Sequence, residues 1–174
     1  SEYLWWRGLS EIDYVLATHA DADHIDGLND VLKNFTVKAA LVGRTPANDP
    51  EFEKFSQTIA ETRTHLERIQ AGDVIRFGEV EVSALWPPAE GIGSDNNDSV
   101  VLRIKLGERS ILLTGDIEKA AERSLTASMQ LKTDVVKVPH HGSKSSSTAA
   151  FLAAVGPRVA LLSAGFRNRH GHPH

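Results

Sequence analysis

Four apolar segments of strand length are each followed by histidine or aspartate, and this pattern constrains the fold more than any other feature of the chain. The segments are residues 12–18, 111–113, 135–138 and 159–163. A sheet fixes the backbone while the loops at its strand ends supply side chains, so such positions suit a functional site. We therefore expect the four strand ends to converge at one edge of a sheet and to form a polar pocket there.

The remaining segments predict strands mixed with helices. Apolar residues recur at helical spacing over residues 25–32 and again from Pro50 to Ile69, which places His65 on the surface of the second helix. Further strands and helices are predicted at residues 37–42, 74–77, 80–86, 100–106, 117–129 and 148–155. There is no internal repeat and no linker, so we expect an α/β fold in one domain over residues 1–174.

Composition excludes several classes of protein. With 41% hydrophobic and 24% charged residues the chain can build a core, and it contains no cysteine for disulfides or thiolate metal sites. No apolar run approaches the roughly 18 residues of a transmembrane helix. The net charge of −4 argues mildly against a large nucleic-acid footprint, although two bound divalent cations would offset it.

The first polar cluster reads His19-Ala-Asp21-Ala-Asp23-His24. Alternate residues of an extended loop point the same way, so His19, Asp21 and Asp23 can share one face, and the helix that follows turns His24 toward it. The alternative is that Asp23 only caps this helix and that the histidines lie on the surface. Capping explains one of these residues rather than four, so the cluster predicts a metal site.

The second polar group combines Asp116 with the pair His140-His141. Asp116 follows an apolar strand through Gly115, and its alternative role is to cap the helix that begins at Ile117. The two histidines follow the rigid Pro139, and adjacent side chains cannot easily face one ion. We therefore expect one histidine to bind metal and its neighbour to point to substrate; the alternative is a solvated loop.

These residues resemble the metallo-β-lactamase superfamily, whose signature is His-x-His-x-Asp-His, with Asp21 here in the second histidine position. The stretches LLTGD, VPHHGS, NNDSVVLRI and GHPH make residues 4–174 most similar to the soluble domain of ComEC-family DNA-uptake competence proteins. The resemblance implies an αββα sandwich. Family domains begin with further strands that would precede Ser1, so we expect this chain to lack the first N-terminal strands.

The resemblance also implies a role for each polar residue. His19 and Asp21 would bind a first ion, and Asp116 would bridge it to a second ion bound by Asp23, His24 and His141. Catalysis is assigned to Asp23, His140 and His172, with His172 as an alternative ligand, and substrate contacts to Asn97, Ser143 and Lys144. Most superfamily members have one more histidine ligand before the position of Asp116. Since His65 is the only histidine in that interval, Asn97 or a water would complete the first ion's shell.

The ligand set of three carboxylates and three imidazoles favours Mn(II), with Zn(II) second. The implied function is a metal-dependent phosphodiester hydrolase, a nuclease acting on single-stranded DNA during uptake. The full-length protein would be embedded in a membrane, with this domain in the cell envelope outside the cytoplasmic membrane. Two alternatives remain: a small-molecule phosphodiesterase of the same fold, and a non-catalytic module that binds DNA or a partner.

Overall fold

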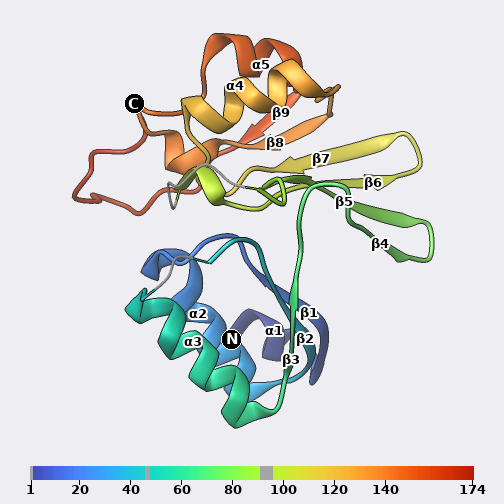
Figure 1. The fold of residues 1–174 in the computed structure, drawn as a ribbon, viewed down its shortest axis with the longest axis vertical. Helices are drawn as coiled ribbons and strands as arrows, with labels where there is room; N and C mark the ends of the chain where they lie inside the picture. Colours follow the sequence, from blue (N-terminus) through green and yellow to red (C-terminus); the bar gives the residue numbers. More distant parts are fainter. Residues whose placement is uncertain (1, 46–47, 91–95) are drawn as a thin grey trace. The chain divides into compact units, whose positions relative to one another are not determined.

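The computed structural model describes residues 2–45, 48–90 and 96–174. They form two compact units, residues 1–69 and 70–174, each with its own sheet and hydrophobic core (Figure 1). Among the described residues, every helix is too short or too polar to cross a membrane. The mixture of sheets and helices confirms the predicted α/β class, whereas a single domain over residues 1–174 stays a prediction.

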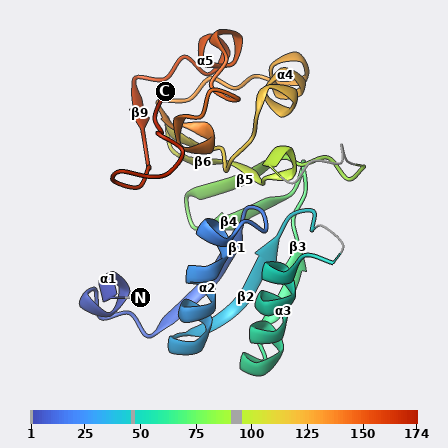
Figure 2. The same cartoon turned by 90° about the vertical axis from the view of Figure 1, so that its left-hand side faces the viewer.

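The first unit is a small parallel α/β layer. Its elements are α1 (Glu2–Trp6), β1 (Glu11–Ala17), α2 (Ala22–Asn34), β2 (Thr36–Val42), α3 (Pro50–Thr62) and β3 (His65–Arg68). The strands pair in parallel in the order β1-β2-β3. Parallel neighbours need a crossover connection, and α2 and α3 provide it side by side on one face of the sheet (Figure 2).

The hydrophobic core of this unit fixes the backbone on both sides of the first polar cluster. Ile25 of α2 and Phe55 of α3 are fully buried against Val15, Ala40 and other residues of β1 and β2. Burying an apolar side chain of this size stabilises the fold by roughly 1.5–3 kcal/mol. The end of β1 and the beginning of α2 are therefore anchored on both sides of the polar loop between them.

The predicted helix from Pro50 to Ile69 is wrong in its last turns. The helix ends at Thr62, where Arg63 adopts a left-handed conformation (φ 57°), and His65–Arg68 forms β3 on the edge of the sheet beside β2. Apolar spacing alone did not separate the two structures, because Leu66 fits a helical stripe as well as an edge strand. His65 thus lies on a strand, where its side chain is 70% exposed.

The second unit contains a larger mixed sheet. Its strands are β4 (Val74–Phe77), β5 (Val80–Trp86), β6 (Val101–Leu106), β7 (Arg109–Leu113), β8 (Val135–Lys137) and β9 (Val159–Leu161). They pair in numerical order, antiparallel from β4 to β7 and parallel from β7 to β9. Helices α4 (Lys119–Ser128) and α5 (Ala149–Val155) pack against each other and cover this sheet (Figure 1).

The parallel strands bring three of the four polar loops together. Because β7, β8 and β9 run the same way, the chain after each of them emerges at one edge of the sheet. The fully buried Leu112 and Val136 hold β7 and β8 in the core beneath that edge. The fourth polar segment follows β1, which belongs to the other sheet, so the expectation of a single shared sheet edge is wrong.

Candidate metal centre

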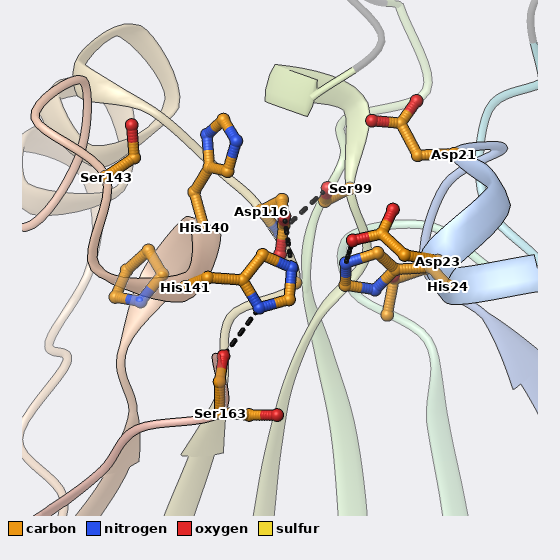
Figure 3. A network of polar contacts seen from close by, with 12 residues as sticks. Asp21, Asp23, His24, Ser99, Asp116, His140, His141, Ser143 and Ser163 are labelled. Carbon is orange, nitrogen blue, oxygen red and sulfur yellow. Dashed lines mark hydrogen bonds and ion pairs between the residues drawn. The ribbon is translucent and has the colours of Figure 1, made fainter. Parts of the chain in front are cut away.

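The first cluster occupies the loop after β1 and the first turn of α2. The rings of His19 and His24 lie 4.2 Å apart, and His19 Nε2 is 3.7 Å from a carboxylate oxygen of Asp21. His24 Nε2 is 3.9 Å from Asp23 Oδ2, a contact drawn in Figure 3. The structure therefore brings all four predicted ligands of this unit together.

Helix capping does not account for these residues. Asp21, not Asp23, is the N-cap residue of α2, and its side chain makes no capping hydrogen bond. Instead its carbonyl accepts the backbone N–H groups of His24 and Ile25 at 2.9 and 3.0 Å. Asp23 in the first turn is favoured by the helix dipole, while half of the Asp21 side chain stays exposed. Neither carboxylate is explained by capping the helix.

Asp116 lies at the edge of the second sheet, three residues after β7. Its side chain is only 4% exposed, and its backbone N–H donates to Ser99 Oγ at 3.1 Å. The alternative role as a cap is wrong, because the N-cap residue of α4 is Glu118. Lys137 Nζ lies 3.4 Å from Asp116 Oδ1 and 3.0 Å from the Gly115 carbonyl, which places an ammonium group beside this buried carboxylate.

His141 is held by one ring nitrogen and faces Asp116 with the other. Its Nδ1 donates to the Ser163 carbonyl at 2.6 Å, and its Nε2 lies 3.2 Å from Asp116 Oδ2 (Figure 3). A carbonyl only accepts, so Nδ1 carries the hydrogen and Nε2 of the neutral ring has a lone pair. Two acceptor atoms at this distance require a proton or a cation between them, and a carbonyl behind the ring is typical of metal-binding histidines.

The turn that carries both histidines has an unusual backbone. His140 and His141 are left-handed at φ 45° and 52°, and Gly142 follows at φ 77°. Positive φ costs a non-glycine residue of the order of 1–3 kcal/mol and clusters at functional sites. At Gly142 a Cβ would lie 2.8 Å from Pro173 Cβ, so only glycine allows the C-terminal tail to approach this turn.

His140 is held by a carboxylate that sequence reasoning missed. Its Nδ1 lies 3.1 Å from Glu118 Oε1, which also accepts the Ser145 hydroxyl at 2.7 Å. The rings of His140 and His141 are 6.3 Å apart at 73°, so the two side chains point in different directions. That one histidine binds metal while the other points to substrate stays a prediction.

The tail places His172 beside His140, with the ring centroids 5.8 Å apart. Asn168 organises this tail: Oδ1 accepts the backbone N–H groups of His170 and His172, and Nδ2 donates to the His172 carbonyl at 2.8 Å. Sequence reasoning missed Asn168, because a single asparagine in a polar tail carries no signal of its own. Burial, followed by the charges of His174, His140 and other neighbouring histidines, lowers the pKa of His172 and favours its neutral form.

The predicted substrate-binding residues have different surroundings. Ser143 Oγ is 2.9 Å from Ser145 Oγ, which connects it to Glu118, and Lys144 is exposed on the same loop. Asn97 is buried, and its Oδ1 accepts the backbone N–H groups of Glu118 and Ala121 at 3.1 Å. Asn97 therefore caps the beginning of α4 from a distant loop, and its contact with substrate stays a prediction.

Comparison with known proteins decides the family. The family model described as the metallo-beta-lactamase superfamily matches residues 2–165. The chain belongs to this superfamily. The predicted family is thereby confirmed, and its fold generally binds divalent metals, often two.

This superfamily member is similar to competence proteins. It is 36% identical to ComE operon protein 3 of Bacillus subtilis over 99% of this chain and 22% of that protein. It is 31% identical to competence protein ComA of Neisseria gonorrhoeae over 95% of this chain and 22% of that protein. The predicted resemblance is confirmed, and the chain spans about a fifth of the length of these curated relatives.

A solved structure supports the fold independently of close sequence similarity. The crystal structure of CmlA, a diiron β-hydroxylase from Streptomyces venezuelae, matches 87% of this chain and 35% of that chain. The TM-score is 0.57 and the sequence identity 18%, so the likeness concerns the fold alone. The predicted metallo-β-lactamase fold is thereby confirmed. Because one fold carries different reactions, the function of this superfamily member has to be argued from its own site.

Proposed function

We propose that this chain is a binuclear metal-dependent phosphodiester hydrolase that acts as a DNA nuclease. The observation that carries the proposal is the pair His141–Asp116. The Ser163 carbonyl fixes the hydrogen on Nδ1 of His141, and the remaining nitrogen faces a buried carboxylate oxygen at 3.2 Å. A divalent cation satisfies both of these acceptor atoms at once, as an imidazole nitrogen and a carboxylate oxygen are its ordinary ligands.

The proposed ligand set is the one that the superfamily signature implies. His19 and Asp21 would hold the first ion, Asp23, His24 and His141 would hold the second, and Asp116 would serve both. Superfamily membership and the clustering of donors within each unit support this assignment. The oxygen-rich set favours Mn(II), although the affinity order of divalent metals allows Zn(II) to be bound as well.

The chain's own residues complete the chemistry. The ions supply Lewis acidity at the phosphoryl oxygens and lower the pKa of a water nucleophile. Asp23 orients that water, while His140 or His172 faces the leaving oxygen and provides its proton. Ser143, the exposed Lys144 and Asn97 contact the substrate, with the lysine ammonium suited to a flanking phosphate.

The substrate and location follow from the relatives rather than from the site. One relative is named as a competence protein, and both this relative and ComE operon protein 3 align with nearly all of this chain. We therefore propose single-stranded DNA as substrate during DNA uptake, within a longer membrane-embedded protein, and a place in the cell envelope outside the cytoplasmic membrane. A net charge of −4 is compatible with this substrate once two divalent cations are bound.

The decisive experiment combines metal analysis with a nuclease assay. Purified protein is loaded with Mn(II), its metal content is measured, and cleavage of single-stranded DNA is followed for the wild type and Asp116→Ala. We expect cleavage by the wild type, loss with EDTA and loss in the variant. Intact DNA in the presence of fully loaded wild-type protein would overturn the nuclease assignment.

The same assay separates the alternatives. Turnover of bis(p-nitrophenyl) phosphate without any cleavage of DNA would indicate a small-molecule phosphodiesterase. A non-catalytic module would instead retain metal weakly and bind DNA equally well after Asp21→Ala and Asp116→Ala.

A further inference from the structure

We infer that Glu118 is a positioning residue that fixes the tautomer of His140, so that His140 Nε2 is the atom that exchanges a proton with the substrate. The inference rests on the proposed function. Glu118 Oε1 lies 3.1 Å from His140 Nδ1 and accepts the Ser145 hydroxyl at 2.7 Å. As a carboxylate Glu118 can only accept, so the hydrogen of the neutral ring resides on Nδ1.

Partial burial keeps this pair together. The side chains of His140 and Glu118 are 22% and 28% exposed, which limits the competition of water for the hydrogen bond. Glu118 is itself fixed, because its backbone N–H donates to the Asn97 side chain at 3.1 Å. The carboxylate is therefore oriented from the helix start, and the ring is oriented by the carboxylate.

The two adjacent histidines are held in parallel ways with different acceptors. His141 donates from Nδ1 to the neutral Ser163 carbonyl, whereas His140 faces the carboxylate of Glu118. Their left-handed backbone turns the rings apart, at an interplanar angle of 73°. Each ring thus presents Nε2, and the acceptor behind it differs between the ligand and the proton-transfer residue.

With the ring in this orientation, His140 can protonate the leaving oxygen in the hydrolysis step. The bond between phosphorus and the leaving oxygen breaks, and that oxygen takes the proton from Nε2 of the doubly protonated His140 ring. The ring returns to its neutral form with the hydrogen on Nδ1, still bonded to Glu118. The attacking water supplies the oxygen that stays on phosphorus, and its proton is released to solvent.

A structural role for Glu118 has to be separated from positioning. Ser145 bonds to the same carboxylate oxygen, and its carbonyl accepts the backbone N–H of Lys119 at 3.1 Å, so Glu118 also ties the serine loop to α4. Ser145→Ala removes this side-chain tie and the longer contact of the Ser145 hydroxyl with His140 Nδ1 at 3.4 Å, and it leaves the Glu118–His140 contact in place. It is therefore the matched control for Glu118→Ala.

The first measurement reads the tautomer directly. Long-range ¹H–¹⁵N correlation spectra of His140 are recorded for metal-free and Zn(II)-loaded protein at about pH 8, above the ordinary pKa of histidine. We expect the Nδ1–H form in the wild type and in Ser145→Ala. In Glu118→Ala we expect the Nε2–H form to appear, because only the longer contact of Nδ1 with the Ser145 hydroxyl, at 3.4 Å, then remains.

The second measurement uses the leaving group. Cleavage of DNA expels an alkoxide that needs a proton, whereas bis(p-nitrophenyl) phosphate expels a stable anion that does not. Glu118→Ala is expected to lower kcat for DNA on the order of 10-fold with little change in KM. Turnover of the nitrophenyl ester should be nearly unchanged, and Glu118→Asp should recover part of the lost rate on DNA.

The outcomes are separable from those of the proposed function. If the wild type cleaves neither substrate, the nuclease proposal fails, while the spectra still decide the tautomer. If Glu118→Ala does not fold, Glu118→Gln replaces it, since the amide offers both a donor and an acceptor and permits both tautomers. A pure Nδ1–H form in Glu118→Ala overturns the inference, as does a loss of kcat in Ser145→Ala equal to that in Glu118→Ala.

Discussion

The two units carry their polar residues in different ways. In the first unit four donors lie within six consecutive residues, and the loop after β1 and the first turn of α2 bring them together. In the second unit the polar residues follow the ends of separate strands and are held by Ser163, Glu118 and Asn168 from elsewhere in the chain. A contiguous cluster can be recognised in the sequence as a motif. A cluster built from separate segments depends on supporting hydrogen bonds that a sequence motif does not contain.

The difference in burial between Asp116 and Asp21 predicts the largest contrast. Asp116→Ala is expected to lower kcat/KM on single-stranded DNA by more than about 100-fold, because water cannot easily replace a buried carboxylate in the proposed ligand role. Asp21→Ala is expected to cost only about 10-fold, since water can replace a carboxylate that is half exposed. Nuclease kinetics and bound Mn(II) per protein check both values.

Asp13→Ala is the control for this contrast. Asp13 is exposed on β1 and bonds to Lys38, so its removal should leave metal content and rate unchanged. Equal losses in Asp21→Ala and Asp116→Ala would show that burial does not distinguish the two donors.

The same contrast explains what the sequence predicted. Apolar runs, and polar residues placed directly after them, predict several features of the structure. These features are the first cluster, the positions of β1, β2 and both hairpins, and the contact of Asp116 with His141. Such features are local, or follow from the rule that parallel strands end at one edge.

Other features depend on contacts between distant segments. The helix predicted through Ile69 ends at Thr62, because pairing with β2 draws residues 65–68 into a strand. Glu118 and Asn168 are polar residues in polar surroundings, and only the folded chain shows which side chain each one holds. Periodicity and spacing record neither strand pairing nor these hydrogen bonds.

Helix capping offers a second way to sharpen the comparison. In the first unit Asp49 caps α3 locally through the N–H of Phe52 at 2.8 Å, and Asp49→Ala should cost about 1 kcal/mol. In the second unit the fully buried Glu122 accepts the N–H and the hydroxyl of Thr148 at 2.9 and 2.7 Å and the N–H of Ser147. Glu122→Ala leaves buried donors unsatisfied and should cost about 2–4 kcal/mol.

Denaturant unfolding combined with hydrogen exchange measures these two costs and assigns each to its unit. Glu122→Gln is the control, because one amide oxygen still accepts part of the network, and it should lose less than Glu122→Ala. A cost for Glu122→Ala no larger than that for Asp49→Ala would remove the distinction between local and long-range capping.

The tail provides a smaller, local test. Asn168→Ala removes the bonds that shape the segment before His172, so kcat on DNA should fall on the order of 10-fold. Amide exchange should accelerate in residues 165–174 and stay unchanged in α4. In the first unit Thr18→Val removes only the contact between the Thr18 hydroxyl and His19 Nδ1. It should therefore lower kcat on DNA less than Asn168→Ala does. Unchanged exchange in the tail of the asparagine variant would contradict this account.

The smallest expected effect is the loss of local stability as the pH falls. Burial and neighbouring histidines lower the pKa of His172, so the unfolded chain binds the proton more readily than the folded one. The stability associated with His172 is therefore complete above its ordinary pKa of about 6.5 and is lost as pH falls below that value through the folded pKa.

In the first unit the hydrogen bond from Lys54 lowers the pKa of Asp26, so loss of stability there begins only below the ordinary value of 3.8. Hydrogen exchange of metal-free protein at stepwise lower pH should thus loosen the His172 tail before α2, and His172→Gln should remove the earlier step. If the tail and α2 loosen over the same pH range, the two units do not differ in this respect.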